Sequence, residues 1–581
     1  MAERRNLTAG ALGDSALLIT CGDSAAQLAR CCRENRLPGV VDIVFSFDVV
    51  GVYFDASKIV SCHAKPPSEV VTEWINERCR AVGEIEIEQG TLVEIPVCYG
   101  GQAGADLQRV ADHANLSPAE VIRRHHETEY RVGTIGFAPG FAYLEGLPPE
   151  LQTPRLATPR THVPAGSVAI GGASTGVYPQ DSPGGWNLIG RTSVRLFDLQ
   201  RQPPSLLQTG DRVRFRPALA DELVADELVA GELVAGELIA DELTADELAA
   251  LTSGPPPPAP PTTATTPVLK LISAGMQTTL QDEGRPGWQA VGVSPSGAMD
   301  PVSLQLANLL AGAPRDAVAI EATLVGPVLQ ALDDITLGIA GSMPPRLDTP
   351  QRLRLKRGDQ LDLRQLIGGS RCYVGIAGGL TCDMVLDSGA TDLRAGWGGM
   401  QGRALAAGDL LGVKQPTLAS PLNITLSPFI GSLPLSNATV ELRFLPGLQT
   451  EGFSAAGLRQ FRSSEYQISN QSDRMGLRCT GPPVTPPQAD QVPSQPVTYG
   501  TIQIPPDGQP VILGADRQTV GGYPVIGCVI TADLPKLGQL APGSTIRFQE
   551  ISLNEAERLR RETDQALAIA ATGIALREQQ P

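Results

Sequence analysis

A five-residue repeat separates the chain into two parts. Residues 221–248 read DELVADELVAGELVAGELIADELTADEL, in which Glu-Leu returns every five residues. On a helix, at about 100° per residue, this period turns each successive leucine by about 140°, and on a strand it places successive leucines on opposite faces. Neither conformation gives a continuous apolar face. The repeat is therefore interpreted as an acidic, solvated spacer, in preference to a recognition element.

A proline-rich run follows the repeat and extends the spacer. Residues 252–267 read TSGPPPPAPPTTATTP, whose prolines favour an extended polyproline conformation and exclude a continued helix. We predict a linker over residues 218–267. The 581-residue chain is too long for one core, and its 62 Gly and 49 Pro indicate many short strands joined by turns. These patterns alone predict a β-rich fold with several domains.

Charge and apolar patterning exclude several classes of partner. The net charge is −16, but residues 218–251 hold ten acidic residues and no Lys or Arg, so the remainder carries only −6. No Lys/Arg run marks a basic patch, and a nucleic-acid partner is therefore not expected. No window approaches the roughly 18 to 20 apolar residues of a membrane helix, and the N-terminus lacks a secretory pattern. We expect a cytoplasmic protein with no membrane partner.

The first part of the chain gives clear local predictions. In VVDIVFSFDVVGVYFD, alternate residues over positions 41–47 are apolar, which predicts a half-buried strand. In LSPAEVIRRHHETEY, Ser117 is predicted to cap a helix, with a proline in the first turn and Glu120 completing a capping box. All five histidines occur in this part without the spacing of a zinc site, so no metal is predicted. His125 suits a packed residue better than a catalytic one, and it is kept as a substrate-binding candidate.

Residues 133–192 form the most informative stretch of the first part. Their glycines and prolines impose turns between short strands and let backbone N–H groups approach a bound anion or amide. Ser182, Trp186 and Arg191 lie beside these turns, where they would supply a hydroxyl, a flat face and a bidentate charge. The alternative interpretation is a barrel with tight corners and no site.

Several motifs of the first part carry a family resemblance. They are IPVCYGG, IGFAPGFAYLEGLP, TPRLATPRTHVPAGSVAIGG, TGVYPQDSPGGWNLIGRT and GDRVRF. Together they resemble the family of the 5-oxoprolinase B subunit, also called allophanate hydrolase subunit 1 or carboxyltransferase subdomains C and D. His162 stands where that family usually has Arg.

The second part of the chain has its own local signals. Asp300 before Pro301 predicts a helix start, and the apolar positions that follow are Val302, Leu306, Leu309 and Leu310. Three acid–arginine pairs in turn-rich stretches are substrate-binding candidates: Asp282 with Arg285, Asp473 with Arg474, and Asp516 with Arg517. The alternative for Asp282 and Arg285 is a loop-holding role, and the alternative for Asp516 and Arg517 is an internal ion pair at a barrel corner.

The second part also resembles a known family through its motifs. These are CYVGIAGGLT, TDLRAGWGGMQGRALAAGDLL, SNQSDRMGLRCTGPP and YGTIQIPPDGQPVILGADRQTVGGYPVIGCVITADLPKLGQLAPG. They are similar to the 5-oxoprolinase C subunit, also called allophanate hydrolase subunit 2 or carboxyltransferase subdomains A and B. Gly389 stands where this family commonly has Arg, and GIAGSMPP replaces a TGAD-like stretch.

The two resemblances imply a fold class, which is α+β and β-rich with cyclophilin-like β-barrels. They imply a small α+β unit over residues 1–95, a cyclophilin-like barrel over 96–217, two β-barrel-like units over 268–550 and a closing helix over 551–581. Because the two families form a joint site, we expect the halves to pack together, within one chain or between chains of a homo-oligomer.

The resemblances also imply an activity. The B and C subunits of this type work with a separate A subunit to open the lactam 5-oxo-L-proline to L-glutamate with ATP hydrolysis, so ATP and an A-type partner protein are expected. The chain has neither the GxxxxGK[ST] phosphate loop nor a biotin-attachment pattern. One alternative is a carboxyltransferase module of urea carboxylase type that uses biotin carried on another protein. A second alternative is a regulatory binder of a histidine kinase.

Overall fold

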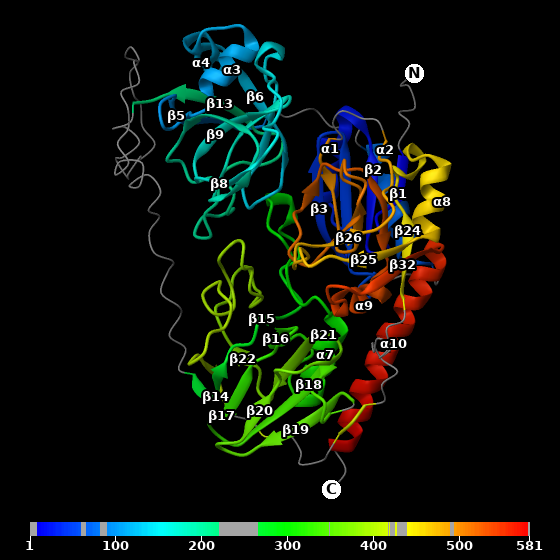
Figure 1. The fold of residues 1–581 in the computed structure, drawn as a ribbon. Coiled ribbons are helices and arrows are strands. Elements are labelled where there is room, and N and C mark those ends of the chain that lie inside the picture. The colour runs from blue at the N-terminus through cyan, green and yellow to red at the C-terminus, as the bar shows by residue number, and fades with distance from the viewer. Residues whose placement is uncertain are drawn as a thin grey trace.

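The computed structural model describes residues 8–59, 65–81, 90–219, 265–347, 349–415, 418, 424–426, 439–487 and 493–578. The repeat and almost all of the predicted linker lie outside the described residues. Four units are distinguished below: an N-terminal sheet with two helices, a first barrel, a pair of packed sheets and a second barrel (Figure 1).

The N-terminal unit is a small antiparallel sheet with helices on one face. Its strand order is β1-β2-β4-β3. The strands are β1 (Thr8–Ala11), β2 (Ala16–Thr20), β3 (Val40–Ser46) and β4 (Val49–Phe54). Helices α1 (Ala25–Glu34) and α2 (Pro67–Ala81) cover the sheet, and Leu28 and Trp74 join Ile43 and Phe45 in the shared core.

The first barrel closes because its seven strands form a ring. Going round, the order is β6-β13-β5-β12-β9-β10-β7, and β7 pairs back with β6. The strands are β5 (Leu92–Tyr99), β6 (Glu129–Ile135), β7 (Ala142–Glu145), β9 (Ser167–Gly171), β10 (Ser174–Val177), β12 (Asn187–Arg191) and β13 (Arg212–Pro217). Two short strands, β8 (Arg160–Val163) and β11 (Ser182–Gly184), pair beside it.

Helices α3 (Leu107–Ala114) and α4 (Pro118–Glu127) connect the first two strands of this barrel. The predicted cap of α4 is confirmed, because the Ser117 hydroxyl accepts the Glu120 N–H at 3.2 Å. The Glu120 carboxylate pairs with Arg123 and Arg124, so it is not the reciprocal half of the predicted capping box.

The second half begins with two five-stranded sheets around one apolar core. One sheet contains β14 (Thr266–Ser273), β17 (Val328–Ala331), β20 (Gln360–Asp362), β22 (Leu380–Thr381) and β23 (Leu410–Val413). The other contains β15 (Gln277–Gln281), β16 (Ala319–Thr323), β18 (Ile335–Met343), β19 (Gln351–Leu355) and β21 (Ile367–Ile376). Helix α7 (Pro301–Ala311) lies on β18 and β21. It approaches so closely that a Cβ at Gly338 would lie 1.9 Å from the Ala307 carbonyl oxygen.

The second barrel repeats the connectivity of the first. Its ring order is β24-β31-β28-β29-β26-β25-β32, so that, in both barrels, the first strand lies parallel to the last and antiparallel to the sixth. The strands are β24 (Val440–Pro446), β25 (Glu465–Ile468), β26 (Gly476–Thr480), β28 (Thr501–Gln503), β29 (Val511–Leu513), β31 (Val525–Val529) and β32 (Thr545–Glu550). The predicted β-rich, multidomain fold class is confirmed, with two closed seven-stranded barrels.

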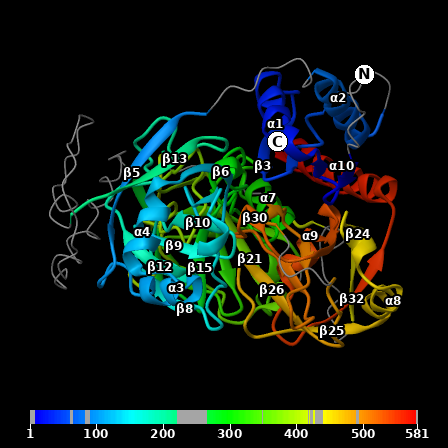
Figure 2. The same ribbon diagram turned by 90° about the horizontal axis from the view of Figure 1, so that it is seen from above.

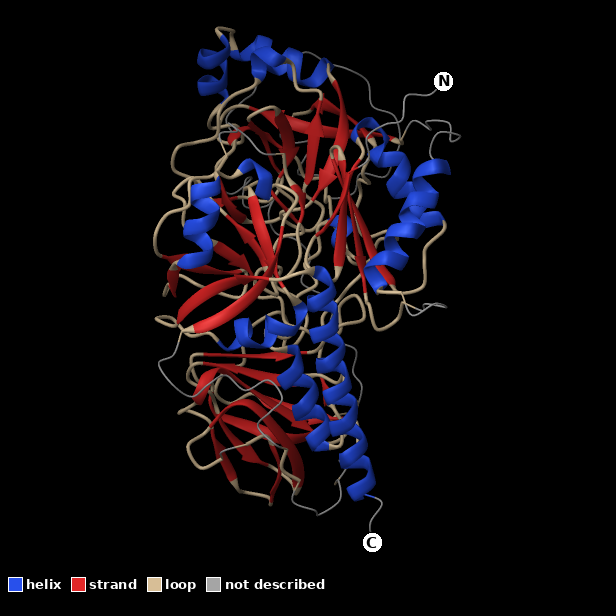
Figure 3. Cartoon of the chain, turned by 90° about the vertical axis from the view of Figure 1, so that its right-hand side faces the viewer, coloured by secondary structure: helices blue, strands red, loops and turns tan. Residues whose placement is uncertain are grey.

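Three helices complete the second half. Helix α8 (Ala455–Ser463) joins the first two strands of the second barrel, as α3 and α4 do in the first, and α9 (Leu534–Gln539) precedes its last strand. Helix α10 (Leu553–Glu578) runs from the second barrel along the packed sheets, where it contacts α7 (Figures 1 and 3). Among the described residues, no helix is long and apolar enough to span a membrane.

The N-terminal sheet packs on the second barrel, although the two belong to different halves of the chain (Figures 1 and 2). The Tyr53 hydroxyl donates to the Val497 carbonyl at 2.8 Å, and the Asp14 carboxylate accepts the Thr531 N–H at 2.8 Å. Val44 of β3 lies in this apolar contact, whereas Ile43 and Phe45 face the helices. The predicted strand is confirmed as β3, but the prediction that it is half-buried is wrong, since the second half covers its other face.

Candidate functional site

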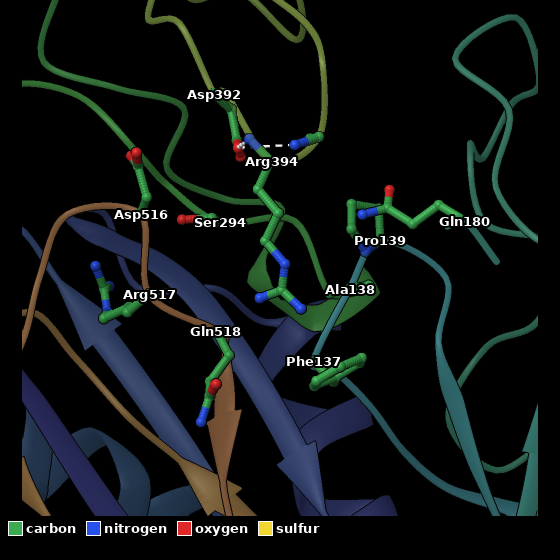
Figure 4. A pocket seen from close by; sticks show the side chains of 12 residues that line it. Phe137, Ala138, Pro139, Gln180, Ser294, Asp392, Arg394, Asp516, Arg517 and Gln518 are labelled. Atoms are coloured by element: carbon green, nitrogen blue, oxygen red, sulfur yellow. Dashed lines mark hydrogen bonds between the residues drawn. The ribbon is translucent and has the colours of Figure 1, made fainter. Parts of the chain in front are cut away.

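A pocket lies where loops of the two halves meet (Figure 4). The first half supplies Phe137, Ala138, Pro139 and Gln180, and the second half supplies Gly292, Ser294, Asp392, Arg394, Ala395, Asp516, Arg517 and Gln518. Concave sites with a few convergent polar groups are the usual place for a small ligand. The pocket is therefore the candidate functional site.

Backbone contacts hold the two walls of the pocket together. The Gly140 N–H donates to the Val291 carbonyl at 2.9 Å. Gly292 has φ +81°, and a Cβ there would lie 2.3 Å from the Ala138 carbonyl oxygen. Only a glycine fits this close approach with a left-handed backbone. The GFAPG turn of the first half is thereby fixed against the start of the second half.

Arg394 crosses the pocket from one half toward the other. Its guanidinium carbon lies 4.8 Å from the centroid of the Phe137 ring, which is a cation–π distance. Nη1 also lies 3.7 Å from the sulfur of Met475. Burial lowers the Arg394 pKa, an effect that the nearby carboxylates of Asp392 and Asp473 oppose. The aromatic ring orients the cation without neutralising it.

Asp392 organises the loop that carries Arg394. Its Oδ1 accepts the N–H groups of Arg394 and Ala395, each at 3.0 Å. Burial raises the pKa of Asp392, and the like charge of Asp516 raises it further. A carboxyl in such surroundings retains its proton to higher pH than an exposed aspartate.

Asp516 is held by a buried ionic network behind the pocket. Arg474 donates to both of its oxygens, from Nε at 2.7 Å and from Nη2 at 2.8 Å. The Ser296 hydroxyl donates to Oδ1 at 2.6 Å. Arg474 also donates to Glu321 at 2.6 Å, and the Tyr373 hydroxyl donates to the same carboxylate at 2.7 Å. The network ties the second barrel to strands β16 and β21.

Arg517 lines the pocket with a side chain that is almost fully buried. Its Nη2 donates to the Gln289 side-chain oxygen at 3.0 Å, and its Nε has no hydrogen-bond partner among the described residues. Burial lowers the Arg517 pKa. The Gln289 N–H in turn donates to Asp42 of the first half at 2.6 Å. The position of Arg517 therefore depends on a contact between the halves.

The structure brings only some of the predicted second-half residues into the pocket. Asp516 and Arg517 line it, and Arg474 lies directly behind Asp516. Asp473 is exposed, and its Oδ1 accepts the N–H groups that follow in its own turn. Asp473 does not line the pocket.

Asp282 and Arg285 hold a loop of the packed sheets. Asp282 accepts the Gly389 N–H at 2.6 Å and the Ser388 hydroxyl at 2.7 Å. Arg285 donates to the carbonyls of Val385 and Ala390. Neither side chain lines the pocket, and both fit the loop-holding alternative.

His125 lies in the core of the first barrel. It is fully buried, with Tyr99 on Nδ1 and Thr175 on Nε2, both at 2.8 Å, and it stacks on the Phe215 ring. Burial lowers the pKa of His125 to about 3, so the ring is neutral at physiological pH. Both nitrogens are engaged, and the residue is outside the pocket lining.

The other first-half candidates lie on β11, on β12 and on the turn between them. Trp186 packs in an aromatic cluster with Phe141, at 5.5 Å between ring centroids. Arg191 donates from Nε to the Ala165 carbonyl at 3.1 Å. The Ser182 hydroxyl and Arg191 Nη2 are buried and have no hydrogen-bond partner among the described residues. None of the three lines the pocket.

Several pocket residues are absent from the sequence-based candidates: Phe137, Gln180, Ser294, Asp392 and Arg394. Asp392 and Arg394 belong to the TDLRAG motif, where an acid and an arginine two positions apart in a glycine-rich loop are a usable signal. Phe137 belongs to the GFAPG motif but carries no polar group, so its role becomes visible only when Arg394 lies on its ring.

Two positions at which the sequence departs from the family patterns, Gly389 and His162, have different surroundings in the structure. A Cβ at Gly389 would lie 2.6 Å from both Cys382 Sγ and Val318 Cγ2, so this backbone has no room for an arginine side chain. His162 lies on the short strand β8 and is exposed. Neither position lines the pocket.

Comparison with known proteins identifies the family of each half of the chain. Residues 7–207 match the carboxyltransferase domain, subdomain C and D, and residues 291–550 match the carboxyltransferase domain, subdomain A and B. The second half is 37% identical to the C subunit of 5-oxoprolinase from Escherichia coli K12 over 301 residues, which are 51% of this chain and 95% of that protein. The chain belongs to the carboxyltransferase-domain family. It is a fusion of the C/D part with the A/B part.

Two further relatives support this assignment of the carboxyltransferase fusion. The first half is 40% identical to the B subunit of 5-oxoprolinase from Bacillus subtilis over 215 residues, which are 35% of this chain and 90% of that protein. The crystal structure of TTHA0988 is similar over 92% of this chain and 99% of its own, with a TM-score of 0.74 and 31% identity. The fusion is thus homologous to enzyme subunits and has a solved structural counterpart for nearly its whole length.

Proposed function

We propose that this chain is the combined B and C component of an ATP-dependent 5-oxoprolinase. With a separate A-type partner protein it would open 5-oxo-L-proline to L-glutamate, with ATP hydrolysis. One observation carries the proposal: both halves line the same pocket, while the 5-oxoprolinase B and C relatives each match only one half. Fusion keeps the two walls of such a site at high effective concentration.

The charge of the pocket suits a small acid, because Arg394 and Arg517 both lie in its lining. The chain also lacks a GxxxxGK[ST] phosphate loop. We therefore assign ATP to the A-type partner and the lactam to this pocket.

The chemistry of lactam opening indicates what the pocket residues would do. A five-membered cyclic amide is unreactive, and phosphorylation of its oxygen by ATP activates the carbonyl carbon for attack by water. The ring C–N bond then breaks, with a proton going to the nitrogen, and leaves an acyl phosphate. A second water hydrolyses the acyl phosphate to the carboxylate and phosphate. Arg394 and Arg517 would stabilise anionic groups, because a guanidinium in a poorly solvated site binds anions strongly. Asp392, whose pKa is raised by burial, would hold or accept a proton at the amide.

Turnover with the partner tests the proposal. The purified chain would be mixed with its A-type partner, and ADP and L-glutamate would be followed with and without 5-oxo-L-proline. We expect 5-oxoproline-dependent release of both products from the mixture, and a large loss of rate in Asp392→Asn. The exposed Arg364→Gln is the matched control, since Arg364 pairs with Asp362 at the end of β20, outside the pocket lining.

The outcome that would contradict the proposal is equally specific. It is the absence of product from the mixture, together with carboxyl transfer when a biotin-carrying protein replaces the partner. That result would favour the urea carboxylase-type alternative.

A further inference from the structure

Arg394 is a half-buried cation whose guanidinium has no carboxylate partner among the described residues. It contacts the Phe137 ring at 4.8 Å and the Met475 sulfur at 3.7 Å, neither of which carries a charge. A buried guanidinium is costly to leave unpaired, because it loses hydration without gaining an ion pair. The natural compensation in a pocket is an anionic ligand.

The acids near Arg394 are engaged elsewhere. Asp392 Oδ1 accepts two backbone N–H groups, one of them that of Arg394 itself. Asp473 Oδ1 accepts the Met475 N–H at 2.8 Å. Both oxygens of Asp516 are taken by Arg474. The charges of Asp392 and Asp473 lower the cost of keeping Arg394 charged, but neither forms an ion pair with it.

The pocket has two chemically different ends. In Figure 4 the Arg394 guanidinium extends toward Phe137 and Ala138, while Ser294 and the carboxyl groups of Asp392 and Asp516 lie near the base of its side chain. A guanidinium binds a planar carboxylate through two parallel hydrogen bonds. The two loop N–H groups use only Oδ1 of Asp392, and a second carboxyl oxygen suits the N–H of an amide.

We propose that Arg394 binds the carboxylate of the ligand, so that the pocket selects small carboxylic acids that carry an amide at the other end. The amide part of this assignment rests on the function proposed above. Phe137 is a positioning residue, since its ring fixes the guanidinium without touching the ligand's reacting atoms. The carboxylate site therefore requires a cation from the second half and a ring from the first.

Calorimetric binding of two lactams to the full chain, without ATP and without the partner, tests this assignment. 5-Oxo-L-proline carries the carboxylate, and 2-pyrrolidinone is the same ring without it. We expect the wild-type chain to prefer 5-oxoproline by about 10- to 100-fold, the range of a charge-assisted pair of hydrogen bonds. In Arg394→Gln this preference should fall to near one, through loss of 5-oxoproline affinity alone, and Arg394→Lys should restore part of it.

Arg403→Gln is the matched control for the same substitution. Arg403 is exposed, pairs with Asp409 and lies outside the pocket lining. Its variant should keep the full preference for 5-oxoproline. Thermal unfolding of each variant reports whether the fold is retained.

The results separate this assignment from the proposed reaction. Carboxylate-dependent binding without turnover in the presence of the partner would uphold the role of Arg394 and contradict the 5-oxoprolinase function. Turnover by the wild-type chain, together with an unchanged preference for 5-oxoproline in Arg394→Gln, would uphold the proposed reaction and contradict the role of Arg394. Equal loss of both lactams in Arg394→Gln, or no binding of either lactam by the wild type, would overturn the assignment.

Discussion

The Arg394 guanidinium lies 4.8 Å from the Phe137 ring, so a cation of the second half is oriented by an aromatic side chain of the first. Phe137→Leu removes the ring and retains apolar volume. We expect a rise in the KM for 5-oxoproline of roughly 3- to 30-fold, in line with about 0.5 to 2 kcal/mol for a cation–π contact, with a smaller change in kcat. Steady-state kinetics with the A-type partner measures both constants. An unchanged KM for 5-oxoproline in a folded Phe137→Leu variant would contradict the orienting role of Phe137.

Arg474 is the centre of the buried ionic network, since it contacts both Glu321 and Asp516. Arg474→Met leaves the buried Asp516 carboxylate without its cation and leaves Glu321 with Arg371 alone. We expect a loss of about 3 to 5 kcal/mol in the free energy of unfolding, measured by urea titration. Arg364→Met, which breaks the exposed pair with Asp362, should cost under about 1 kcal/mol. Similar costs for both variants would mean that the network does not hold the units together.

His125 makes stability depend on pH in a defined direction. Burial lowers the pKa of His125 to about 3, whereas an unfolded histidine titrates near about 6.5. Below about pH 6.5 the unfolded chain takes up a proton that the folded chain excludes, so stability falls as the pH decreases toward about 3. At about 1.4 kcal/mol per pH unit, the loss from this group between pH 7 and pH 5 is about 2 kcal/mol.

A non-titrating variant isolates this effect. In His125→Gln, whose amide can still bond Tyr99 or Thr175, the loss assigned to His125 should vanish, because all other titrating groups are shared. Urea unfolding at pH 7 and pH 5 gives the comparison. Parallel pH dependence in the two proteins would show that His125 is not the titrating group.

The contact between the N-terminal sheet and the second barrel predicts the effect of cutting the chain. Tyr53, Asp14 and Asp42 each make a hydrogen bond to the second half, next to a shared apolar cluster. A protease site inserted between residues 221 and 266 should therefore yield two fragments that elute together in size-exclusion chromatography. Separate elution would mean that the tether, and not the interface, joins the halves.

Local signals in the sequence are sufficient for much of the fold. The Asp300 cap is predicted from one residue and its proline, and the structure confirms it, with Oδ1 accepting the Ser303 N–H at 2.9 Å. Val302, Leu306 and Leu310 are buried as the helical period indicates. These features depend on neighbours within one or two turns, which a single sequence contains.

Such local sequence patterns do not predict contacts between segments that are far apart in the chain. The burial of both faces of β3 depends on a barrel formed more than 380 residues later, and an alternating pattern does not specify a second covering surface. The pairing of Arg394 with Phe137 likewise joins two motifs from different halves. Asp473 and Arg474 are adjacent in sequence, yet only Arg474 is buried, because the turn directs Asp473 to solvent. Residue type and spacing identified the region of the site more reliably than its members.

The central claim, that both halves build one 5-oxoprolinase site, is tested most directly by the activity of the separated halves. Residues 1–217 and 268–581 would be produced as two chains, and 5-oxoproline-dependent ADP release would be measured with the A-type partner. We predict activity for the intact chain and for the two fragments together, and none for either fragment alone. Turnover by a single fragment with the partner would contradict this claim.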